Sequence, residues 1–85
     1  MDELMQRVLH ILVNVVAPGM ARIVCLEGDF GGFMRFDRIN RRYILETDCL
    51  EWLGTVSDYR EGALKLAERH GLKPEQVDIE IEFDY

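Results

Sequence analysis

The hydrophobic positions of the chain follow two different periods, and the changes of period divide it into elements. Apolar side chains cover most of a helical circumference in residues 3–17, and the polar positions between them are Glu3, Arg7, His10 and Asn14. Their spacings of four, three and four residues follow the turn of an α-helix. Pro18-Gly19 is a typical helix end. We predict a first helix over residues 3–17, so apolar that a sheet and a second helix, or a second subunit, must cover it.

Three segments with alternating side chains come next: ARIVCLE, FMRFDRI and RYILETD. If the connecting loops are residues 28–32 and 40–41, the antiparallel register brings the apolar side chains to one face of a sheet. The predicted neighbours are Val24 with Phe36, Phe36 with Leu45, Leu26 with Met34, and Arg35 with Glu46. The last is a favourable pair of opposite charges. The pattern predicts a three-stranded antiparallel meander.

The stretch GDFGGF, residues 28–33, is a glycine cluster that either turns the chain or holds a phosphate. A phosphate-binding loop needs a helix after it, and in one form a Gly-Lys-Ser/Thr ending. Here an alternating segment follows instead. Glycines between two strands supply the backbone angles of a hairpin loop, so we interpret the cluster as a turn.

The segment DCLEWLGTV, residues 48–56, predicts a short helical turn that tucks Leu50, Trp52 and Leu53 under the core. Trp52 is explained by packing or by an interface, where tryptophan is enriched. Ser57 is a suitable cap for a second helix over residues 58–70, and Gly71 with the nearby proline predicts its end. The side expected to be buried carries Tyr59, Ala63, Leu66 and Ala67.

The last segment, VDIEIEFDY, alternates apolar residues with carboxylates, which predicts a strand with one face in water. We expect it at the sheet edge, parallel to the first strand of the meander. The fold class is therefore α+β, in the order α-β-β-β-α-β. It has a four-stranded mixed sheet, made of the meander and the C-terminal edge strand, and two helices on one face. Residues 1–85 are expected to form a single domain.

Charge is unevenly distributed along this chain of net charge −6. Residues 35–42 hold four arginines and one aspartate, a net charge of +3, and residues 74–85 hold five carboxylates and no cation, a net charge of −5. The carboxylates are Glu75, Asp78, Glu80, Glu82 and Asp84. On a strand, those of alternate residues lie roughly 6.8 Å apart. Such a row either protects a solvated edge strand from aggregation or docks on a basic protein surface.

The second interpretation predicts a non-enzymatic acidic module that occupies a basic surface of a partner protein, such as the nucleic-acid-binding surface of that partner. By analogy of size and charge alone, small inhibitors of the anti-CRISPR kind and nuclease immunity proteins work in this way. Secondary candidates for partner contact are Arg38, Arg41, Arg42 and Trp52. Three arginines are a thin footprint for nucleic acid, so we do not expect direct binding to it. The alternative is a structural homodimer joined through the N-terminal helix.

No pattern in the sequence predicts a catalytic, cofactor or metal site. Cys25 and Cys49 lack a metal-ligand spacing and are expected to be free thiols of a reducing compartment. His10 lies on the polar stripe of the first helix, and His70 ends the second. The acidic N-terminus is unlike a secretory signal and no stretch is long enough for a membrane span. We therefore expect a cytoplasmic protein.

Overall fold

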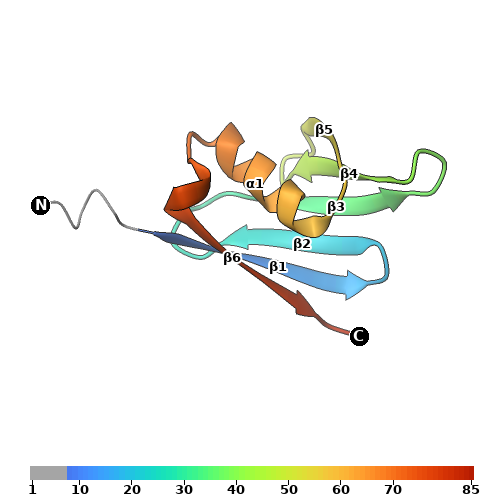
Figure 1. Cartoon of the computed structure of the whole chain (residues 1–85), viewed down its shortest axis with the longest axis horizontal. Coiled ribbons are helices and arrows are strands. Elements are labelled where there is room, and N and C mark those ends of the chain that lie inside the picture. Colours follow the sequence, from blue (N-terminus) through green and yellow to red (C-terminus); the bar gives the residue numbers. More distant parts are fainter. Residues whose placement is uncertain (1–7) are drawn as a thin grey trace, which may run out of the picture.

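The computed structural model describes residues 8–85, which form a six-stranded mixed sheet and one α-helix (Figure 1). The strands are β1 (Leu9–Ala17), β2 (Met20–Cys25), β3 (Gly31–Asp37), β4 (Arg42–Thr47), β5 (Trp52–Val56) and β6 (Val77–Phe83). The helix α1 (Tyr59–Arg69) is followed by a one-turn 3-10 helix, η2 (Pro74–Gln76). The sheet order is β5-β4-β3-β2-β1-β6. The predicted four-stranded sheet with two helices is therefore wrong, and the domain is a β-rich α+β fold.

The predicted first helix is a strand over the part of it that the structure describes. β1 lies inside the sheet, antiparallel to β2 and parallel to β6. Its odd-numbered residues Ile11, Val13 and Val15 are buried, while the even-numbered ones face the other side. Since Leu12 and Val16 are also apolar, the strand period is hidden in the sequence. Residues 3–7 of the predicted helix lie outside the described residues, and the dimer through that helix loses its basis.

The meander exists, but its first hairpin has another register. Val24 lies opposite Gly31 and not Phe36, because Gly31 and Gly32 belong to β3 instead of the loop. A Cβ on either glycine would lie 2.5 Å from a backbone oxygen of a neighbouring strand, so these positions require glycine. The odd shift turns Val24 and Leu26 away from the core and brings Ala21, Ile23 and Cys25 into it.

The second hairpin differs from its prediction by two residues, which keeps each side chain on its expected face. Met34 lies opposite Leu45, and Phe36 opposite Tyr43. Arg35 faces Ile44 and not Glu46, which faces Phe33. The predicted pair of opposite charges is thus not formed by direct neighbours.

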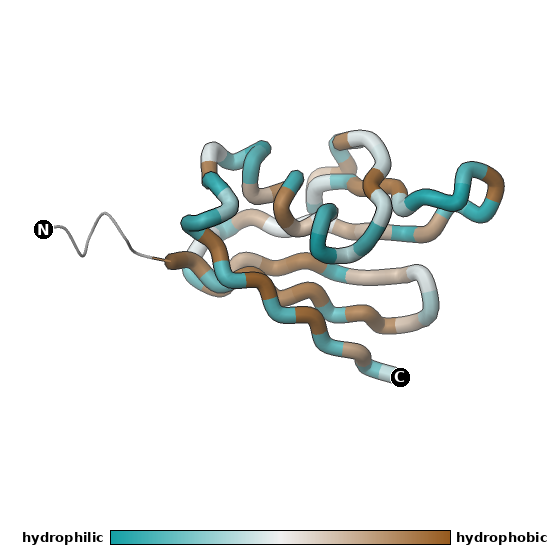
Figure 2. Tube along the Cα trace, viewed as in Figure 1, coloured by the Kyte–Doolittle hydropathy of each residue, from teal (hydrophilic) through white to brown (hydrophobic). Residues whose placement is uncertain are grey.

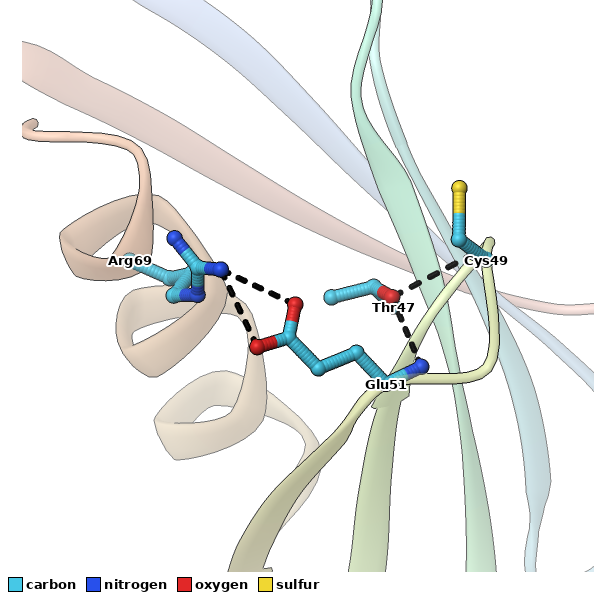
Figure 3. Close-up of polar contacts among 4 residues, drawn as sticks. All are labelled: Thr47, Cys49, Glu51 and Arg69. Atoms are coloured by element: carbon cyan, nitrogen blue, oxygen red, sulfur yellow. Dashed lines mark hydrogen bonds and ion pairs between the residues drawn. The ribbon is translucent and has the colours of Figure 1, made fainter.

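Residues 48–56 form a turn and the strand β5 instead of a short helix. Leu50 and Trp52 are exposed, whereas Leu53 packs against the core. Thr47 holds this turn, because its hydroxyl accepts hydrogen bonds from the N–H groups of Cys49 and Glu51 (Figure 3). The Glu51 carboxylate then accepts from Arg69 at 2.9 and 3.0 Å, which ties the turn to the end of α1.

The predicted second helix is confirmed as α1, with a different cap. The Asp58 carboxylate, and not Ser57, accepts the hydrogen bond from the Glu61 N–H. Ala63, Leu66 and Ala67 are buried as expected, together with Gly62, and Tyr59 is partly buried. Gly71 ends the helix with φ +82°, a conformation that favours glycine.

The last strand is confirmed as β6, an edge strand of alternating hydropathy (Figure 2). It runs parallel to β1 and not to the segment at residues 20–25, because β1 takes the place next to the meander. Leu9 lies opposite Val77 and Val15 opposite Phe83. In this register the carboxylates of β6 lie on the same face of the sheet as the even-numbered residues of β1.

The sheet has two unequal faces. We call the one beneath α1 the covered face: it carries the core, which is Ile11, Val13, Val15, Ala21, Ile23, Cys25, Met34, Leu45 and Val56, packed against Ala63, Leu66 and Ala67 of α1. We call the opposite one the open face. Over the part of the chain that the structure describes, no helix lies on the open face (Figure 1). In the same part, no helix is long and apolar enough to cross a membrane.

Candidate functional site

The carboxylates of β6 form a row along the edge of the open face. Asp78, Glu80 and Glu82 lie opposite His10, Leu12 and Asn14 of β1 and are all exposed. Asp84 follows the strand and its N–H bonds to the Val15 carbonyl, so the chain continues in the same direction. Glu75 lies apart, in η2. Of the five predicted residues, the structure thus brings Asp78, Glu80 and Glu82 together, with Asp84 beyond one end; we call these three the carboxylate row.

Within residues 8–85, no cation forms an ion pair with the carboxylate row. Three strands separate β6 from β4, so Arg38, Arg41 and Arg42 of the β3–β4 hairpin do not close off the row. Unpaired carboxylates about 6.8 Å apart along a strand repel one another and favour a cationic partner. The row therefore keeps its charge available at the surface.

An apolar hollow adjoins the carboxylate row. It has a volume of about 230 Å³ and is lined by Leu12 and Leu26 together with the row and His10. Leu26 is 63% exposed, and its N–H bonds to the His10 carbonyl, which continues the pairing of β1 and β2 by one residue. An anionic row beside an exposed leucine can bind the charged head and the aliphatic stem of a lysine or arginine together.

His10 and Glu27 complete the site, and neither was predicted to belong to it. The His10 Nδ1 lies 2.6 Å from a Glu27 carboxylate oxygen, and the other oxygen accepts from the His10 N–H. The hydrogen bond and charge of Glu27 raise the pKa of His10, and Asp78 and Glu80 add to the effect. Hydrogen bonds from His10 lower the pKa of Glu27. His10 and Glu27 meet because β1 and β2 form a hairpin. The pair could not be predicted from a sequence analysis that assigns residues 3–17 to a helix.

Beyond the hollow, the open face carries large apolar side chains beside charged ones such as Arg22 and Arg35. Its large exposed side chains are Met20, Val24, Leu26, Phe33 and Trp52. Leu12 and Ile44 are partly buried between them. Trp52, a secondary candidate, lies opposite Glu46 at the far edge and is 65% exposed. The Arg22 guanidinium lies 5.9 Å from the centre of the Phe33 ring, a cation–π distance.

The predicted arginine cluster lies on the hairpin of β3 and β4, which extends beyond the other strands (Figure 1). The Asp37 carboxylate organises the tip by accepting from the Ile39 N–H and the Asn40 amide, and these bonds lower its pKa. Arg41 has φ +58° at this tip. The structure separates the cluster, because Arg42 turns back and donates to Thr55. A partner for Arg38 and Arg41 stays a prediction.

The two cysteines and His70 lie outside the candidate site. Cys25 is buried in the core and Cys49 is exposed, both as free thiols. The His70 ring stacks on Phe30 with centroids 4.2 Å apart. Among residues 8–85, no three His, Cys, Asp or Glu side chains lie close enough to hold a metal ion.

Comparisons with protein-family models, with curated proteins and with solved structures give no match for this chain.

Proposed function

We propose that this protein is a non-enzymatic protein-binding module, which uses the carboxylate row of β6 and the hollow beside it to occupy a basic surface of a partner protein. The observation that carries this proposal is the row itself: Asp78, Glu80 and Glu82 are exposed on one face, with no ion pair inside the described chain. The geometry has the anion spacing and the apolar neighbour that a lysine- or arginine-rich surface needs.

A nucleic-acid-binding protein is a suitable partner, because its basic groove is built to receive regularly spaced anions. A row of carboxylates on a rigid strand supports competition for such a groove in the manner of an inhibitor. Complementary charge also speeds association, and this effect falls steeply with ionic strength. The proposal accordingly concerns the rate of binding as much as the affinity.

The test is a charge reversal with a charge-matched control. In the variant Glu80→Lys/Glu82→Lys the row changes sign, whereas Asp29→Lys/Glu68→Lys makes the same change of net charge at exposed positions away from it. Both proteins are used to capture partners from a lysate of the source organism at low and high salt. Association rates are then measured with the purified partner. We expect the row variant to associate about tenfold more slowly or worse at low salt and the control to resemble the unmodified protein.

Equal association rates for the row variant and the control would refute the proposal. So would a partner whose capture does not weaken with salt. Thermal unfolding of both variants is measured in parallel, and we expect little change because the substituted side chains are exposed.

A further inference from the structure

The open face exposes a group of large apolar side chains that no described element covers. Val24, Phe33 and Met20 are 37%, 37% and 52% exposed, on adjacent strands in the middle of the sheet. Single exposed hydrophobic residues are common on proteins, but a contiguous group of them marks a binding surface. The carboxylate row borders this group. The partner that the row attracts is therefore expected to meet the apolar side chains as well.

The charges of the open face change sign across the strands. The register places Glu82 of β6 beside Asn14 of β1, Asn14 beside Arg22 of β2, and Arg22 beside Phe33 of β3. Arg35 lies two residues along β3, on the same face. Leu12 of β1 lies opposite Val24 of β2, and Leu26 follows Val24 on the same face, whereas His10 and Asn14 flank Leu12 along β1. We call Leu12, Val24 and Leu26 the apolar strip: it lies between the carboxylate row on β6 and the two arginines, Arg22 on β2 and Arg35 on β3.

The dimensions of this strip fit an α-helix. Two strand spacings separate β6 from β2, about 9.6 Å, and an α-helix with side chains is about 10–12 Å wide. Along the strip, the three carboxylates span about 13.6 Å, and helix positions i, i+4 and i+8 span about 12 Å. Flexible lysine and arginine side chains can bridge the small difference.

We infer that the open face binds an amphipathic α-helix of the partner, laid along β1 and β2, with cations at i, i+4 and i+8 on the flank that meets the carboxylate row. The helix turns its apolar stripe toward Leu12 and Val24, and its other flank meets Arg22 and Arg35. This inference rests on the proposed function, because the partner is the basic protein of that proposal. It adds the shape of the partner and the strands on which it docks.

Two other occupants fit the face less well. A partner strand added at the free edge of β6 would leave the apolar strip uncovered. A second copy packed face to face by a two-fold axis along or across the strands would set β6 against β5 or against another β6. β5 contains no cation, and the cation that reaches it on the open face is Arg42, which donates to Thr55. The carboxylate row would then meet one arginine or its own charge.

The experiment uses two synthetic peptides of about four helical turns and identical composition. The patterned peptide has a leucine stripe flanked by lysines at i, i+4 and i+8, and the permuted peptide has the same lysines on the side opposite the leucines. Binding to the full chain is measured by fluorescence anisotropy at low salt, and helix formation by circular dichroism. We expect the patterned peptide to bind about tenfold more tightly or better and to become helical on binding.

A matched pair of variants tests whether the peptide binds at the apolar strip. Val24→Glu introduces a carboxylate on the strip, and Ile39→Glu introduces the same group at a 91% exposed isoleucine on the hairpin tip. We expect Val24→Glu to weaken the patterned peptide about tenfold and Ile39→Glu to change little. Thermal unfolding of Val24→Glu is compared with that of Val24→Thr, a milder change at the same site, so that a loss of folding is recognised.

Each result bears on a different claim. If the two peptides bind equally and Glu80→Lys/Glu82→Lys weakens both, the inference of a docked amphipathic helix is wrong, whereas the proposed binding through the carboxylate row stands. Peptide binding that ignores the row variant would count against the proposed function as well. Failure of both peptides to bind, or sedimentation of a dimer that Val24→Glu dissociates, would overturn the inference, the latter by assigning the open face to a second copy.

Discussion

The two faces of the sheet differ in how far their apolar side chains are buried. On the covered face, apolar residues from five strands are almost fully buried against α1, so this core is covered within the chain itself. On the open face, apolar residues of the same strands stay partly in water, between carboxylates on one border and arginines on the other. Hydrophobic residues on the first face explain folding. Those on the second face stay exposed in the described chain, and a group of exposed apolar side chains is typical of a binding surface.

The largest expected difference between the faces is in stability, and neighbouring residues of β4 test it. Leu45→Ala on the covered face should lower the free energy of unfolding by about 2–5 kcal/mol, because it leaves a cavity under α1. Ile44→Ala on the open face should cost about 1 kcal/mol, since Ile44 is only partly buried. Urea unfolding measures both. Equal losses would mean that the open face is as tightly packed as the core.

A smaller effect is expected where α1 meets the covered face. Gly62→Ala would place a Cβ 2.4 Å from the Met34 Sδ and 2.6 Å from its Cε, in the buried layer between helix and sheet. We expect a loss of about 1–3 kcal/mol from overpacking, which exceeds the gain of up to 1 kcal/mol from helix propensity. Arg60→Ala, on the exposed side of α1, is the control and should change stability by less than about 0.5 kcal/mol.

Thermal unfolding of these variants separates the two contributions. The double variant Gly62→Ala/Met34→Val, which makes room for the new methyl group, should recover part of the loss. A Gly62→Ala protein more stable than the unmodified one would show that the covered face has space beneath the helix.

The difference between the faces also explains which elements the sequence predicts. β6 and β1 are adjacent parallel strands, but the sequence pattern predicts a strand only for β6 and a helix for the region of β1. Its outer positions are charged, so the alternation is plain. In β1 the outer positions include Leu12 and Val16, which fill the pattern and imitate an apolar helix. The many β-branched residues, Ile11, Val13, Val15 and Val16, were the available signal for a strand.

The candidate site was predictable in part for the same reason. The carboxylate row could be predicted because it needs only the period of one strand. The hollow with Leu26, and the His10–Glu27 pair, depend on the pairing of β1 with β2 and on the length of a glycine-containing loop. A local pattern does not contain that register, and an odd error in it moves every side chain to the other face.

The smallest effect we predict is a change in titration on the open face, where His10 contacts Glu27. Glu27→Gln should lower the pKa of His10 toward its ordinary value of 6.5, because it removes the partner that raises it most, and Glu80→Gln should lower it less. Since folding raises the pKa of His10, the pair's contribution to stability is complete below pH 6.5 and is lost as pH rises through the raised value. The pKa of Glu27 is lowered, so the contribution is also lost when pH falls through that value.

NMR titration of the His10 ring in the three proteins measures this directly, with Glu68→Gln on α1 as a control that should leave it unchanged. The pair is then strongest in the pH range between the two shifted values. There the imidazolium lies beside Asp78 and Glu80 and offsets part of the charge that attracts a basic partner. Above the pKa of His10 the site gains negative charge, so association with a cationic helix should quicken modestly. If Glu27→Gln leaves the His10 titration unchanged, the ion pair is not formed in solution, and the open face does not gain charge in this way.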